Sequence, residues 1–355
     1  MSNLFNKPYP KKKLMQYIGN ISQVGGLKHY EIASGPGKGV GAVDFKTGTG
    51  FEFTVLLDRG MDISEARYNG QSLCWRSSNG DISPQFFDPK GRGWLKSFFG
   101  GLMITCGLSN VGIPCQDGGE EYGLHGRYTS FPASNIEIEQ KWDNNEFEMK
   151  VEGQMRETAV FGPNLLLTRE ISAKLGENRL IIQDRIENQG SEKTPVMILY
   201  HCNFGFPLLD EHALLISPTK KLIPRDADAE QGKENYFKFQ PPTKGYKEKV
   251  YGHEMQPDKQ GFVHIALVNK NRGLGIYLKY LKKQLPQFTQ WKMMGQGTYA
   301  CGLEPGNCGV LGRVQEREAG TLEYLNPGEI KETQLEIGVL TGKKDIEQFI
   351  KHNVK

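Results

Sequence analysis

One carboxylate late in the chain has the surroundings of a general base. Glu304 ends a run of strand-forming residues and is followed directly by Pro305 and Gly306. Both following residue types are disfavoured in a central strand, so we expect the backbone to bend immediately after the acid. A carboxylate held where a rigid strand ends is well placed to take a proton from a bound molecule. The sequence therefore predicts that Glu304 is a catalytic base.

Two histidines are candidates for the partner of this base. His125 precedes a glycine in Leu-His-Gly, and His201 precedes Cys202 and Asn203 at the end of an apolar run. A single histidine at a strand end is more often structural than catalytic. Two of them, together with a carboxylate beside a Pro-Gly pair, favour a site for proton transfer. We expect His125 and His201 to converge on Glu304.

The residues that could bind a metal ion give a weaker pattern. The six cysteines are scattered without a CxxC pair, and Cys301 and Cys308, on either side of Glu304, have no histidine near them in sequence. Small buried side chains explain these cysteines better than a metal centre does. A divalent ion held by His125, His201, His253 and a carboxylate remains the alternative. His253 closes a long polar stretch and fits a site or a surface equally well.

The elements that must position these residues read as β-strands. Glycine is frequent, at 43 of 355 residues, and turn signals recur at short intervals between runs with a period of two. This pattern predicts a large antiparallel all-β sandwich or barrel with few short helices. The expected β-hairpins cover residues 136–153, 166–186 and 261–280, with further strands at 194–201 and 333–340. Residues 218–255 are expected to be an ordered loop, and residues 344–350 a helix.

Composition narrows the class of protein. We expect a peripheral N-terminal arm over residues 1–25 and a single domain over residues 26–355. The net charge is +3 and basic residues are dispersed, which argues against a nucleic-acid partner. No signal peptide is recognised and no run approaches the roughly 18 apolar residues of a membrane helix. Reduced thiols and a cytoplasmic location are therefore expected, without a membrane partner.

Four short segments, taken in order, resemble the aldose 1-epimerase (galactose mutarotase-like) superfamily. They are Leu124-His125-Gly126, Tyr200-His201-Cys202-Asn203-Phe204-Gly205, Leu222-Ile223-Pro224 and Leu303-Glu304-Pro305, and the closing Leu325-Asn326-Pro327-Gly328-Glu329 is similar as well. The resemblance covers residues 30–342. It implies a β-supersandwich with a sugar cleft across one sheet. The segments Leu-Asp-Arg-Gly-Met-Asp and Gln-Trp-Lys-Met resemble those of a divergent branch of this superfamily.

The resemblance also implies a reaction and roles for the candidate residues. Glu304 would take the proton of the anomeric hydroxyl and His201 would protonate the ring oxygen, so that the sugar ring opens and recloses as the other anomer. No cofactor and no metal are implied, since only protons move. His125 would contact the ring-oxygen region. The expected sugar-binding residues are completed by Arg59 (or Arg127 in its place), Asn203, Glu248, His253, Trp291 and Lys292.

Two other functions remain open at this point. The same scaffold could bind or sense a sugar without catalysis, because a fold does not fix a function. A metal-dependent sugar isomerase is the third candidate. In each case the partner is a small-molecule sugar, and a basic Arg59 or Lys292 in the cleft would favour an acidic or phosphorylated one. The sequence leaves a homodimer open.

Overall fold

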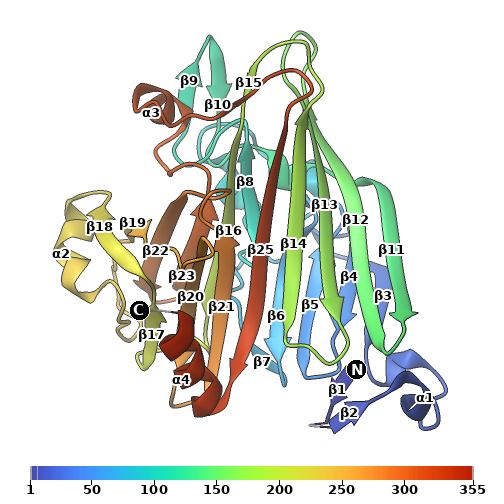
Figure 1. The fold of residues 1–355 in the computed structure, drawn as a ribbon. Coiled ribbons are helices and arrows are strands. Elements are labelled where there is room, and N and C mark those ends of the chain that lie inside the picture. Colours follow the sequence, from blue (N-terminus) through green and yellow to red (C-terminus); the bar gives the residue numbers. More distant parts are fainter. Residues whose placement is uncertain (1, 6, 354–355) are drawn as a thin grey trace.

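The computed structural model describes residues 2–5 and 7–353, and antiparallel β-sheets dominate it (Figure 1). The largest sheet has eight strands, and two smaller sheets lie behind it in Figure 1, side by side. In sheet order, its strands are β11 (Ser134–Asp143), β12 (Glu146–Thr158), β13 (Asn164–Lys174), β14 (Arg179–Asn188), β25 (Ile330–Thr341), β21 (Leu274–Leu281), β20 (Phe262–Asn269) and β17 (Ala213–Ile216). The predicted all-β antiparallel sandwich is confirmed.

The two smaller sheets have six and five strands. The six-stranded sheet runs β18 (Thr219–Pro224), β19 (Lys249–Met255), β22 (Gln287–Gly295), β23 (Thr298–Gly306), β16 (Met197–Gly205) and β8 (Ile104–Leu108). The five-stranded sheet runs β3 (Gly26–Glu31), β4 (Gly41–Lys46), β5 (Phe51–Leu56), β6 (Asp62–Tyr68) and β7 (Gln71–Ser72). Three short pairs complete the strands: β1 (Ser2–Leu4) with β2 (Lys7–Tyr9), β9 (Cys115–Asp117) with β10 (Glu120–Tyr122), and β15 (Thr194–Pro195) with β24 (Tyr324–Leu325).

Helices are few and short, as expected. The α-helices are α1 (Lys11–Leu14), α2 (Ala227–Gly232), α3 (Arg313–Glu318) and α4 (Gly342–Asn353). Single 3₁₀ turns are η1 (Ile21–Gln23), η2 (Pro84–Phe86), η3 (Gly93–Lys96), η4 (Tyr128–Ser130) and η5 (Lys233–Asn235). Within residues 2–5 and 7–353, no helix has the length and apolar character needed to cross a membrane.

The hairpins expected from alternating sequence patterns are present. β11–β12, β13–β14 and β20–β21 are antiparallel pairs at the predicted places, and α4 covers the predicted helix. On β12 the burial alternates almost without exception, which is the pattern of a strand with one face on the core. The N-terminal residues add β1, β2 and α1, and bury Leu4 and Leu14 against the core. The boundary at residue 25 stays a prediction.

Two local predictions were wrong. Residues 218–255 are not one loop, because β18 and β19 pair within them and join the six-stranded sheet. The backbone also does not leave the sheet after Glu304, since Pro305 pairs with Phe288 of β22. β23 pairs with β16 at Gly306 and again at Leu303. Pro305 lies between those two positions, where a residue without an N–H is tolerated.

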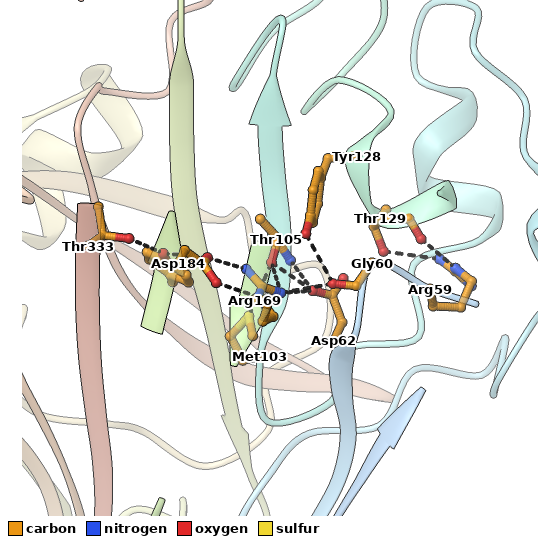
Figure 2. A network of polar contacts seen from close by, with 11 residues as sticks. Arg59, Gly60, Asp62, Met103, Thr105, Tyr128, Thr129, Arg169, Asp184 and Thr333 are labelled. Atoms are coloured by element: carbon orange, nitrogen blue, oxygen red, sulfur yellow. Dashed lines mark hydrogen bonds and ion pairs between the residues drawn. The ribbon is translucent and has the colours of Figure 1, made fainter. Parts of the chain in front are cut away.

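A buried ionic network joins the three large sheets (Figure 2). Arg169 of β13 donates to both oxygens of Asp184 on β14, at 2.8 and 2.6 Å, and to Asp62 of β6 at 3.1 Å. The same guanidinium reaches the Thr105 hydroxyl on β8 at 2.8 Å, and the Tyr200 hydroxyl on β16 donates to Asp184 at 2.7 Å. The network therefore fixes β16 from the side opposite to His201.

Candidate active site

Adjacent strands bring the predicted base and acid together on the six-stranded sheet. In the antiparallel pair β16–β23, Cys202 lies opposite Leu303, so the next step in register brings His201 beside Glu304. Nε2 of His201 is 3.2 Å from Oε1 of Glu304, and both side chains are almost fully buried. Thr289 of β22 lies opposite Glu304 on its other side. Antiparallel register alone thus assembles the floor of the site.

The contact between acid and base depends on a glycine two residues before Glu304. Residues two apart on a strand share a face, so a side chain at Gly302 would point at the same space as the carboxylate. A Cβ there would lie 2.4 Å from Oε1 of Glu304 and 3.1 Å from Cε1 of His201. Gly302 therefore makes room for the acid–base pair.

Replacing Gly302 with alanine is expected to displace the carboxylate while leaving the fold intact, because this glycine has no left-handed backbone conformation. Misplacement of a reacting group by about 1 Å can cost roughly 10²-fold in rate. We expect a loss of that order in any activity that needs Glu304, with the circular dichroism spectrum unchanged. Gly252→Ala on β19 is the matched control, because its Cβ would meet only ordinary contacts at 3.7 Å. Equal activities for the two variants would contradict this role.

His125 approaches the pair from a loop above the sheet. Its backbone has a positive φ of 57°, which non-glycine residues seldom adopt, and its N–H donates to Gly112 O. The Gly112 N–H in turn donates to Nδ1 of His125 at 3.3 Å. Burial lowers the pKa of His125 to about 3, so the ring is neutral at pH 7. Because Nδ1 accepts, the proton is on Nε2, which can donate to a bound oxygen atom.

A chain of hydrogen bonds builds one wall of the site from β18, β19 and β22. Arg225, the residue after β18, donates from Nη2 to Oε1 of Glu248 at 2.9 Å. Trp291 donates from Nε1 to Oε2 of the same carboxylate, also at 2.9 Å. Each Glu248 oxygen keeps a free lone pair, so Glu248 and Arg225 together present an acceptor and a donor side by side.

These residues enclose a cavity of about 270 Å³. The aromatic side chains Trp94, Phe98 and Trp291 line it, and Phe98 and Trp291 lie within 5.7 Å of the His201 ring, centroid to centroid. Aromatic faces beside a few polar groups are typical of small-molecule sites. The complete lining is Arg92, Trp94, Leu95, Phe98, Gly112, Ile113, Pro114, Leu124, His125, His201, Arg225, Glu248, Val250, Thr289, Trp291, Glu304 and Val310.

A second hollow, of about 330 Å³, lies over the eight-stranded sheet and is lined largely by charged side chains. Those charges are paired with one another, as in Lys174 with Glu148 at 3.1 Å and Arg179 with Glu177 at 2.7 Å. Paired, partly exposed charges of this kind are ordinary surface ion pairs. We therefore place the functional site in the cavity around Glu304.

Burial favours the uncharged forms of the central pair. It raises the pKa of the Glu304 carboxyl well above its ordinary value, with the charge of Glu248 acting in the same direction and that of Arg225 against it. It lowers the pKa of His201 to about 4. Among the described residues, Oε1 of Glu304 and Nδ1 of His201 have no hydrogen-bond partner of standard geometry. Burial therefore acts against a charge on either side chain, and two groups in such close contact titrate as a pair that can share one proton.

Two predicted sugar contacts lie on the wrong face of their strands. Successive side chains of a strand point to opposite faces, so Lys292 points away from the cavity that Trp291 lines. Its Nζ donates to the backbone oxygens of Asn235 and Lys238. On β19, Val250 lines the cavity, whereas His253 is directed to the other side, where it contacts Thr219 at 2.9 Å. Neither Lys292 nor His253 reaches the site.

The predicted arginine and asparagine also lie elsewhere. Arg59 is fully buried and donates to the backbone oxygens of Thr129, Ile82 and Ser97. Its alternative, Arg127, contacts Glu157 at 3.3 Å and does not line the cavity. Asn203 donates to the backbone oxygen of His201 at 2.8 Å. Asn203 thus supports the strand of His201 and does not line the cavity.

The structure brings together five of the residues singled out from the sequence: His125, His201, Glu248, Trp291 and Glu304. It adds Arg225, Arg92, Trp94, Phe98 and Thr289, which the sequence did not single out. Thr289 lies two residues before Trp291 on the same strand, so the strand period would have placed both on one face. Arg225 could have been found because it directly follows the Leu-Ile-Pro segment. Nothing in the sequence marks the loop of Arg92. Within residues 2–5 and 7–353, no three His, Cys, Asp or Glu side chains form a metal-binding group.

Comparison with known proteins places the chain in a family. Residues 37–339 match the family described as Domain of unknown function (DUF4432). The chain belongs to this family. No curated protein matches this DUF4432 chain.

Solved structures give the wider relationship. A protein of Klebsiella pneumoniae subsp. pneumoniae MGH 78578, called a putative aldose 1-epimerase, has a TM-score of 0.88 and 26% identity, over 93% of this chain and 88% of its own. A galactose mutarotase-like protein of Clostridium acetobutylicum scores 0.61 at 13% identity, over 90% and 99% of the two chains. The galactose 1-epimerase of Lactobacillus acidophilus NCFM scores 0.56 at 13% identity, over 89% and 99%. This DUF4432 protein is a divergent member of the aldose 1-epimerase (galactose mutarotase-like) superfamily.

Proposed function

We propose that this DUF4432 protein is a sugar isomerase that interconverts the anomers of an aldose by acid–base catalysis. The observation that carries the proposal is the contact of 3.2 Å between His201 and Glu304 in the floor of an aromatic-lined cavity. The Klebsiella pneumoniae protein, which shares 26% identity with this chain, is called a putative aldose 1-epimerase, and this supports the same class of reaction.

The reaction uses the one proton that the pair holds. Its transfer across the contact gives a Glu304 carboxylate, which the charge of Arg225 stabilises, and a His201 imidazolium. The carboxylate then takes the proton of the anomeric hydroxyl while the imidazolium protonates the ring oxygen, so the C1–O5 bond breaks and an aldehyde forms. His125 would donate from Nε2 to an oxygen near the reacting centre.

The open-chain sugar is then bound by an uncharged pair. Glu304 has gained a proton and His201 has lost one, so neither carries a charge, and burial favours this state. Rotation about C1–C2 presents the other face of the aldehyde, and the reversed proton transfers close the ring as the opposite anomer. Trp291 would pack on the apolar face of the sugar, and Arg225 with Glu248 would hold neighbouring hydroxyls.

The test is mutarotation followed by polarimetry, starting from pure anomers of a panel of aldoses, with and without the protein. We expect at least one aldose to equilibrate faster than the buffer rate in proportion to protein concentration. Calorimetry on the same panel tests the alternative, which is a protein that binds sugars without catalysing mutarotation. Sugar binding without any acceleration would make the protein a sugar-binding or sensing protein and would contradict the proposal.

The pH dependence of this activity is expected to extend unusually far into acid. The active pair carries one proton, and a second proton binds only below the pKa of His201, about 4. The rate should therefore hold from neutral pH to about pH 4 and fall tenfold per pH unit below it. The alkaline limb belongs to the carboxyl group, whose pKa burial raises. An acid limb near pH 6.5, the value of an exposed histidine, would contradict the description of the pair.

A further inference from the structure

One cationic side chain of the cavity has no counter-charge. Arg92 lines the cavity at its exposed rim, and the described residues offer its guanidinium no hydrogen bond or ion pair. Arg225 differs, because it pairs with Glu248 and with Asp226, each at 2.9 Å. Asp88, the acidic residue nearest to Arg92 in sequence, is already paired with Lys96 at 2.8 Å.

The backbone of Arg92 is held in place although its side chain is free. Gly93 N–H donates to Lys90 O at 2.8 Å, and Leu95 N–H donates to Arg92 O at 3.1 Å. The adjoining Gly91 accepts from Leu124 N–H, next to His125, and a Cβ on Gly93 would lie 2.4 Å from Asp88. The loop is therefore tightly packed and ties the position of Arg92 to that of His125.

The acidic groups of the cavity do not neutralise Arg92. Among the residues that the structure describes, two carboxyl groups line it, Glu248 and Glu304. Glu248 is paired with Arg225, and Glu304 lies on the buried floor, where burial raises the pKa of its carboxyl group. The guanidinium of Arg92 therefore stays unpaired at the rim, and this group is the one best suited to bind a carboxylate or a phosphoryl group with two hydrogen bonds.

We propose that Arg92 binds an anionic group, a carboxylate or a phosphoryl group, that the sugar carries at the end away from its anomeric carbon. The anomeric end lies on the floor at Glu304 and His201, where the side chains are almost fully buried, whereas Arg92 is exposed at the mouth. Arg59 and Lys292, which the sequence offered as basic cleft residues, take no part. This inference rests on the proposed function and narrows its substrate class to acidic sugars.

The experiment compares kcat/KM for mutarotation of a neutral aldose, its uronate and its 6-phosphate at low ionic strength. We expect wild type to prefer one anionic sugar over the neutral one by roughly 10- to 100-fold, the range of a charge-assisted hydrogen bond. Arg92→Gln should remove that preference, mainly through KM. Lys90→Gln, at an exposed lysine two residues away that does not line the cavity, should keep it. A preference for the uronate would mean that Arg92 binds a carboxylate, and a preference for the 6-phosphate would mean that it binds a phosphoryl group.

The outcomes separate the two proposals. Acceleration of neutral and anionic sugars to the same extent, or equal behaviour of Arg92→Gln and Lys90→Gln, would overturn the role of Arg92 and leave the proposed function standing. No acceleration of any sugar would count against the proposed function. In that case calorimetric titration of the uronate and the 6-phosphate into wild type and Arg92→Gln still decides the role of Arg92. Binding that does not depend on Arg92 overturns it.

Discussion

Arg169→Met is expected to lower the free energy of unfolding by about 3–5 kcal/mol, the cost of breaking a buried ion pair from one side. The substitution leaves Asp62 and Asp184 buried without their cation, together with a Tyr200 hydroxyl and a Thr105 hydroxyl that share its bonds (Figure 2). Burial already raises the pKa of Asp62, and the charge of Arg169 is the largest influence that lowers it. Denaturant unfolding measures the loss as a lower midpoint at unchanged slope.

The control for this prediction is a second arginine on the same sheet. Arg185 of β14 pairs with Glu187 at 3.1 Å and is 44% exposed, so Arg185→Met should change stability by no more than about 0.5 kcal/mol. Adding Asp184→Asn to Arg169→Met should recover part of the loss, since it removes one uncompensated charge. Similar midpoints for Arg169→Met and Arg185→Met would show that the network does not hold the sheets together.

Glu304→Gln and His201→Asn are each expected to reduce kcat for anomer interconversion by roughly 10²–10⁴-fold. Glutamine keeps the size of the carboxylate and cannot take a proton, and asparagine cannot carry the imidazolium charge. KM should change little, because the sugar-binding wall of Trp291 and Glu248 is intact. Polarimetry with a substrate identified from the panel measures both parameters.

The double variant tests whether the two residues act as one unit. Groups that share a proton should show non-additive effects, so Glu304→Gln with His201→Asn should be little worse than either alone. Strictly additive losses would mean that the two side chains act in separate steps. Asn203→Ala is the comparison for an indirect effect, since Asn203 contacts only backbone near His201 and lies outside the cavity.

The sequence predicted the structure best where apolar and polar residues alternate along a strand. Alternation predicted β11–β14 and β20–β21, because one buried face fixes both strand and register. The same period should have separated Trp291 from Lys292, since neighbours on a strand cannot line one cavity. The turn expected after Glu304 failed for a different reason. A strand tolerates proline where its N–H is not needed, and that depends on a partner strand remote in sequence.

Contacts between distant segments were beyond the reach of the sequence. Arg59 lies in a polar turn, and only the fold shows that three backbone oxygens occupy its guanidinium. Arg225 belongs to the site because β18 and β19 extend the sheet from a stretch rich in loop-forming residues. Arg92 and Trp94 reach the cavity from a loop whose place is set by packing on Leu124 and Asp88.

The most direct test of the acid–base pair is anomer exchange followed by proton NMR in D₂O at equilibrium. Wild-type protein should transfer magnetisation between the H1 signals of the two anomers of a substrate sugar, and Glu304→Gln should not. The carbon-bound hydrogens should stay, because only hydroxyl protons move in ring opening. Equal exchange for both proteins, or replacement of the hydrogen at C2 by deuterium, would contradict a mutarotation carried out by Glu304 and His201.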